Sequence, residues 1–187
     1  MSVFEYVAVM VGVVLALAVS HVLNFIANVI SNPERVKGYW LHFLWTALIL
    51  AMNLHAWLLL WTFHGQTDFS VSQLAMMLFL AALTFIVARV LVPELQPDRR
   101  LDLRDHFHQI RVPFFTTLSL CWLSPVLGSF VLEGRGFFEP LVLARAFLLG
   151  LSVSGMLIKN LTWHAILSLL CGIPIFVSLA LLRPTLE

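Results

Sequence analysis

Charged residues are scarce in this sequence. Eleven Lys and Arg and ten Asp and Glu make up 11% of 187 residues, whereas 60% are hydrophobic and the mean hydropathy is +0.95. Soluble domains usually carry about 25% charged and at most about 50% apolar residues. The composition therefore excludes a soluble globular domain and a disordered chain. Because the charges nearly balance, it also excludes a nucleic-acid-binding module.

Catalytic motifs and cysteines are equally sparse. The chain contains no Gly-x-Ser-x-Gly, no His-Glu-x-x-His, no phosphate-binding glycine loop and no paired carboxylates within its apolar runs. Its two cysteines, Cys121 and Cys171, both lie in apolar runs and are expected to be buried thiols rather than a disulfide. These absences argue against an enzyme, and the residues predict no cofactor.

The spacing of the charges predicts the fold. Between them lie charge-free runs at 6–33, 38–67, 69–88, 112–132 and 160–182, and the run 140–158 is interrupted only by Arg145. Crossing a hydrocarbon core of about 30 Å takes about 20 apolar residues in a helix. We therefore expect an all-α, six-helix membrane bundle without a soluble domain, forming a single transmembrane domain over residues 1–187. The predicted spans are 4–30, 39–63, 70–92, 112–132, 139–158 and 162–182.

The distribution of basic residues predicts the orientation. Cytoplasmic loops of membrane proteins are enriched in Lys and Arg. Seven basic residues follow the first, third and fifth spans, and two lie on the opposite side: Arg35, Lys37, Arg99, Arg100, Arg104, Arg111 and Lys159 against Arg135 and Arg183. Both termini are therefore expected outside, and the three odd-numbered loops in the cytoplasm.

Residues 94–111 form the only sizeable polar stretch. They hold eight of the charges, and apolar residues such as Leu103 and Phe107 recur among them. A segment of this kind can lie along the cytoplasmic membrane interface and bind a protein partner. The alternative is a solvated connector between two spans.

Several polar side chains fall inside the predicted spans. Such groups cost free energy in hydrocarbon unless they face the bundle, a cavity or another subunit. Two interpretations remain open: hydrogen bonds between helices, or a polar pathway or binding cavity. The candidates from the first two spans are Ser20, His21, Asn24, Asn28, Asn53 and His55.

Arg145 is the one arginine placed deep within a span. It lies six residues after Glu139, about 9 Å along a helix, so a partner is expected. Glu5 and Glu139 are on the same predicted side and are the candidates for an ion pair. Alternatively, the guanidinium binds an anion or takes part in gating.

Seven histidines raise the alternatives of haem and zinc. On the predicted topology His21 and His55 differ in depth by about 10 Å, which argues against a haem held between them. A cytoplasmic zinc site or pH sensor is the other alternative, with imidazoles from His42, His106, His108 and His164. Hydrated interfacial imidazoles would explain the same positions.

A set of polar and aromatic positions in the first 115 residues forms a recognisable pattern. They are Met1, Ser2, Glu5, Tyr6, Ser20, His21, Leu23, Val36, Tyr39, Trp40, His42, Trp45, Asp102, Leu103, Arg104, His106, Arg111, Phe114 and Phe115. In these positions the chain resembles a family of small, uncharacterised bacterial inner-membrane proteins. The resemblance implies a bacterial inner membrane as the location, and it implies no activity.

Three functions are compatible with these observations. The first is a homo-oligomeric channel or transporter with a polar path lined by the first span. The second is a non-transporting sensor or complex subunit that acts through residues 94–111. The third is a redox membrane protein that binds haem or a metal. The expected partners are the lipid bilayer, further copies of the chain and a cytoplasmic protein, and no nucleic acid.

Overall fold

The chain folds into six long helices. The structure, a computed structural model, describes residues 3–66, 68–95, 100–131, 136 and 138–181. The elements in chain order are α1 (Val3–Ser31), the short 3-10 helix η1 (Pro33–Arg35), β1 (Val36–Lys37), α2 (Trp40–Trp61), α3 (Val71–Leu91), β2 (Leu101–Asp102), α4 (Leu103–Val131), α5 (Pro140–Leu157) and α6 (Leu161–Leu181).

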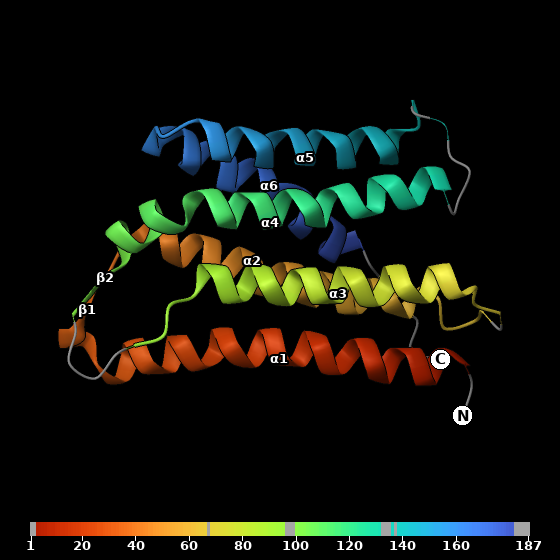
Figure 1. Cartoon of the computed structure of the whole chain (residues 1–187), viewed down its shortest axis with the longest axis horizontal. Coiled ribbons are helices and arrows are strands. Elements are labelled where there is room, and N and C mark those ends of the chain that lie inside the picture. Colours follow the sequence, from red (N-terminus) through yellow and green to blue (C-terminus); the bar gives the residue numbers. More distant parts are fainter. Residues whose placement is uncertain (1–2, 67, 96–99, 132–135, 137, 182–187) are drawn as a thin grey trace.

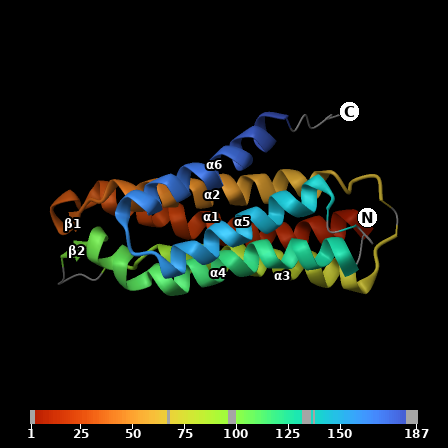
Figure 2. The same ribbon diagram turned by 90° about the horizontal axis from the view of Figure 1, so that it is seen from above.

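The helices form two layers. Helices α1, α3, α4 and α5 lie side by side in one layer, and α2 and α6 lie behind it (Figure 1). The most extensive pairings join α4 with α5, α1 with α3, and α3 with α4, whereas α6 packs on α2 and α5. Figure 2 shows that α6 crosses the bundle obliquely. Helix α1 lies at one edge of its layer (Figure 1). Its side opposite the contacts with α2 and α3 is not covered by another of the described helices.

The prediction of six membrane-spanning helices is confirmed. All six helices are long and apolar enough to cross a bilayer, so the chain is a multi-pass membrane protein. The observed helix ends agree with the predicted ones to within two residues, with one exception at the start of α4. Residues 132 and 182, at the ends of two predicted spans, lie outside the described residues.

The exception corrects the boundary predicted at residue 112. Helix α4 begins at Leu103, so residues 103–111 continue a membrane-spanning helix and do not form a separate segment. The carboxylate of Asp102 accepts hydrogen bonds from the backbone N–H groups of Arg104 (2.9 Å) and Asp105 (3.4 Å), which is the geometry of a helix N-cap. The charged residues between 103 and 111 do not interrupt α4, because charged side chains leave the backbone hydrogen bonds of a helix intact. Residues 96–99 of the predicted segment 94–111 are outside the described part of the chain.

Two short strands join the loops at one end of the bundle. Strands β1 and β2 pair in parallel, with Val36 opposite Leu101 and Lys37 opposite Asp102. They connect the loop after α1 to the loop after α3, which are 65 residues apart in sequence. We call the end of the bundle that carries β1 and β2 the clamp end.

The side of α1 that faces the bundle is built from buried apolar residues three or four apart. They are Phe4, Val7, Val11, Leu15, Ala18, Val22 and Phe25. This spacing keeps one stripe of a helix in contact with its neighbours along the whole length. The side chains on the opposite side of α1 point away from the bundle.

Candidate functional site

The polar residues predicted on the first span lie on the outside of the bundle. Ser20, Asn24 and Asn28 are exposed, and each is four residues from the next, so they form one stripe along α1. Helix α1 has 29 residues and is about 43 Å long, compared with about 30 Å for the hydrocarbon core. A centred α1 keeps Ser20 and Asn24 inside the hydrocarbon and places Asn28 at its border.

Small side chains accompany this stripe. Ala16 and Ala27 are also exposed on the side of α1 opposite its buried residues. Small and hydrogen-bonding residues are what membrane helices use to approach one another closely. We call Ala16, Ser20, Asn24, Ala27 and Asn28 the outer stripe.

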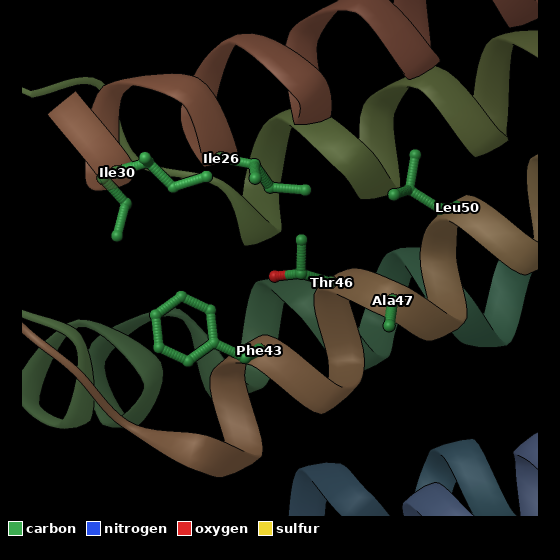
Figure 3. A pocket seen from close by; sticks show the side chains of 7 residues that line it. Ile26, Ile30, Phe43, Thr46, Ala47 and Leu50 are labelled. Carbon is green, nitrogen blue, oxygen red and sulfur yellow. The ribbon is translucent and has the colours of Figure 1, made fainter.

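An apolar crevice lies between α1 and α2, on the side of α1 that faces α2. Its volume is about 360 Å³, and Figure 3 shows side chains of both helices facing one another across it. Thr46 is its only polar lining residue, and the Thr46 hydroxyl donates to the backbone oxygen of His42. The lining residues are Ile26, Val29, Ile30, Phe43, Thr46, Ala47 and Leu50. This crevice fits an apolar side chain or a lipid tail rather than a polar solute.

The polar candidates of α2, Asn53 and His55, lie inside the bundle and do not join the outer stripe. The buried Asn53 donates from Nδ2 to the backbone oxygen of Ile49 (2.8 Å) within α2. An imidazole nitrogen of His55 lies 2.8 Å from the Ser178 hydroxyl of α6. The structure therefore does not gather these residues into one path through a single bundle.

Arg145 is held by α4. Its Nη1 donates to the Ser129 hydroxyl (2.5 Å) and to the backbone oxygen of Pro125 (3.1 Å). This contact joins α5 to α4 next to a proline inside the helix, so it fits a packing role. The ion pair predicted with Glu5 or Glu139 stays a prediction.

Arg111 is a structural residue that the charge pattern missed. Its side chain is buried (8% exposed), and Nη1 donates to the backbone oxygens of Gly155 (3.3 Å), Met156 (2.6 Å) and Ile158 (3.1 Å). These carbonyls end α5, where a helix lacks internal donors and carries partial negative charge. A signal was present, because Arg111 falls on the same buried stripe of α4 as Phe107 and Phe114.

Charged residues at the clamp end form ion pairs, one between distant loops and one between residues five positions apart. Lys37 Nζ lies 2.7 Å from Asp102 Oδ2, and Arg89 Nη1 lies 2.7 Å from Glu94 Oε1. The hydrogen bond from Lys37 lowers the pKa of Asp102, and the same contact raises the pKa of Lys37. The hydrogen bond from Arg89 lowers the pKa of Glu94. Arg89 Nη1 also lies 3.3 Å from His21 Nδ1, so His21 faces α3 rather than the outer stripe.

The four histidines predicted for a metal site do not come together: two are neighbours and the other two lie elsewhere. His42 is fully buried, and its ring centroid lies 5.7 Å from that of His106. His164 is also fully buried but packs against Phe107 (5.7 Å) and Phe115 (5.3 Å). His108 is exposed. Within the described ranges, no group of three or more His, Cys, Asp or Glu side chains could hold a metal ion.

These features define a multi-pass six-helix membrane protein with two distinct polar regions, the outer stripe of α1 and the polar contacts of the clamp end. No family of proteins, no curated protein and no solved structure matches the chain. The resemblance to small bacterial inner-membrane proteins stays a prediction.

Proposed function

We propose that the protein is a homo-oligomeric channel or transporter whose polar path runs along α1 between copies of the chain. The observation that carries this proposal is the exposure of Ser20 and Asn24 at hydrocarbon depth on the outer stripe. An amide or hydroxyl facing lipid can reach only the backbone oxygens of its own helix, whereas one facing a second subunit or a water-filled path has further partners.

The composition of the outer stripe supports assembly with further copies. It carries no charge, and each Asn side chain has both donors and an acceptor, so one stripe complements another. Its Ala and Ser residues let two helix backbones approach closely.

The tightly packed interior of a single bundle also favours a path between copies of the chain over a path through one copy. The positions where α2 and α4 meet are filled by large apolar side chains, among them Trp45, Phe114 and Phe115. Trp45 packs edge to face on both phenylalanine rings at 5.3 Å. A polar solute would have to displace this packing, whereas a path between subunits would not.

Solute flux into liposomes tests the proposal. The wild-type chain is expected to accelerate the passage of at least one of K⁺, Cl⁻, H⁺ or a small neutral solute. Asn24→Leu and Ser20→Val should lower that flux several-fold, because they remove the polar groups from the path. Thr116→Val, which removes an exposed hydroxyl from α4, is the matched control and should leave flux unchanged. Wild-type liposomes with no flux above empty ones, or full flux through Asn24→Leu, would contradict the proposal.

A second candidate, a non-transporting subunit of a larger complex, rests on the clamp end. Arg100, Arg104 and Asp105 are exposed there, and the β1–β2 pair holds the neighbouring backbone. A protein bound to this surface should co-purify with the wild-type chain and be lost from a variant with all three residues changed to alanine. The outer-stripe variants should retain that partner and thereby separate the two functions.

A further inference from the structure

The imidazole of His42 has no hydrogen-bond partner in the part of the chain that the structure describes. It is 0% exposed, and neither Nδ1 nor Nε2 finds a donor or acceptor. Leaving a buried polar group unsatisfied typically costs about 1–3 kcal/mol. A position that accepts this cost for both ring nitrogens is suited to a ligand that binds nitrogen.

The neighbouring imidazole of His106 is prepared as a metal ligand. Its Nε2 lies 3.1 Å from the backbone oxygen of Leu91. Because a carbonyl only accepts, Nε2 must carry the proton, and the lone pair is therefore on Nδ1. Metal-binding histidines characteristically donate their other ring N–H to a carbonyl or carboxylate in this way.

The distance between the two rings fits an ion bound by two nitrogens. The centroids are 5.7 Å apart, and the ring planes meet at 69°. With metal–nitrogen bonds of about 2 Å, two imidazole centroids on opposite sides of one ion are about 6 Å apart. The two rings are in edge-to-face contact, so binding requires them to turn until one nitrogen of each faces the ion.

The number of ligands selects the kind of metal. Zinc requires about four ligands, and the described residues offer no such group. A monovalent d¹⁰ ion accepts two ligands in a line, and imidazole is a good ligand for copper. Its single charge also costs less to bury than a divalent charge, because the cost of burying an ion rises with the square of its charge. We propose that His42 of α2 and His106 of α4 together bind one copper(I) ion at the clamp end of the bundle.

His164 supplies a matched control. Like His42 it is 0% exposed and has no partner for either ring nitrogen among the described residues. Its ring neighbours are Phe107 and Phe115 instead of a second imidazole. Both imidazoles are fully buried and both pack against two phenylalanine rings, Phe25 and Phe43 at His42 and Phe107 and Phe115 at His164. A second imidazole, His106, contacts the ring of His42 only.

Competition for copper(I) against a coloured chelator tests the proposal. The probe is copper(I) itself, held by bicinchoninate under anaerobic, reducing conditions and mixed with the full-length chain in detergent. All proteins carry Cys121→Ala and Cys171→Ala, which removes the buried thiols as alternative soft ligands. The parent should withdraw one equivalent of copper(I). His42→Gln and His106→Gln should withdraw none, and His164→Gln should still withdraw one.

X-ray absorption at the copper edge gives a second readout. The bound ion should show two nitrogen ligands and no sulfur. His106→Gln carries the test if His42→Gln does not fold, because His106 is only partly buried. A parent protein that takes no copper(I), sulfur among the ligands, or equal loss from His164→Gln and His106→Gln would each overturn the proposal.

Discussion

The two ends of the bundle are held together in different ways. At the clamp end, polar contacts join residues far apart in sequence: Lys37 with Asp102, Arg89 with His21, and Arg111 with the end of α5. At the opposite end, the hydrogen bonds that the structure describes in the loop before α3 join residues two or three positions apart, such as Ser70 with Gln73. The capping box of Ser70 and Gln73 is complete within one turn.

This difference separates contacts that form within one turn from contacts that require packed helices. Local turns at the opposite end can form in any helical hairpin, whereas the clamp-end contacts exist only when four helices are in place. Substitutions at the clamp end should therefore weaken the whole bundle, and movements between helices should begin at the opposite end.

Replacing Arg111 should have the largest effect on stability. Arg111→Met removes the donor for three backbone oxygens at the end of α5 and leaves them unsatisfied within the protein. We expect a loss of about 3 kcal/mol in the free energy of unfolding, since hydrogen bonds to charged groups contribute about 1.5–3 kcal/mol. Reversible unfolding in mixed micelles measures it. Arg104→Met, at an exposed position of the same helix, should change stability little, and an equal loss from both would contradict the assignment.

A methyl group added at Gly155 should be the next most harmful change. A Cβ there would lie 2.6–2.8 Å from atoms of the Phe115 ring, which is packed against Trp45 and His164. We expect Gly155→Ala to cost about 1–3 kcal/mol, as overpacked cores do. Gly150→Ala is the matched control on the same helix, because nothing lies within 4 Å of a Cβ there. It should be neutral or stabilise α5 slightly, and thermal unfolding of the two variants side by side tests the difference.

Breaking the ion pair between Lys37 and Asp102 should have the smallest effect, and one that depends on pH. Asp102→Asn keeps an N-cap for α4 but removes the charge. The lowered pKa of Asp102 means that the ion pair stabilises the fold above the ordinary carboxyl value of about 3.9 and is lost as the pH falls through the value in the folded protein. The raised pKa of Lys37 extends this stabilisation to above about pH 10.

Thermal unfolding across pH measures this effect. The wild-type chain should unfold at a higher temperature than Asp102→Asn between about pH 5 and 9, and the difference should shrink below about pH 4. Equal unfolding temperatures of the two proteins at every pH would show that Asp102 acts only as a cap, which asparagine supplies equally well. A difference that stays constant down to pH 3 would contradict an ion pair as its cause.

The membrane spans could be predicted from the sequence to within a residue or two, with one exception. Transfer from water to hydrocarbon depends on composition over about 20 residues, and this is visible in the spacing of charges. The start of α4 differs from the prediction, which began the span after Arg111 because a charge without partners is costly in a membrane. In the structure the C-terminal end of α5, 44 to 47 residues away, supplies partners for the Arg111 side chain.

The residues of the candidate sites could be identified from the sequence, but their positions relative to one another could not. Ser20, Asn24 and Asn28 were identified as one stripe, yet only the rotation of α1 against α2 and α3 decided that this stripe faces outward. Likewise, four histidines were predicted near one edge of the membrane. The packing of Phe107 and Phe115 against His164 keeps that ring apart, whereas His106 contacts His42.

The amino-acid sequence alone is enough to predict that this is a membrane protein, how many helices it has and roughly where they end, because burial in lipid follows from local composition. The packing of the helices sets which polar side chains face outward from the bundle, which pair across helices, and which two imidazoles are in contact. Those outcomes depend on the rotation and pairing of whole helices, which are set by contacts between residues distant along the chain.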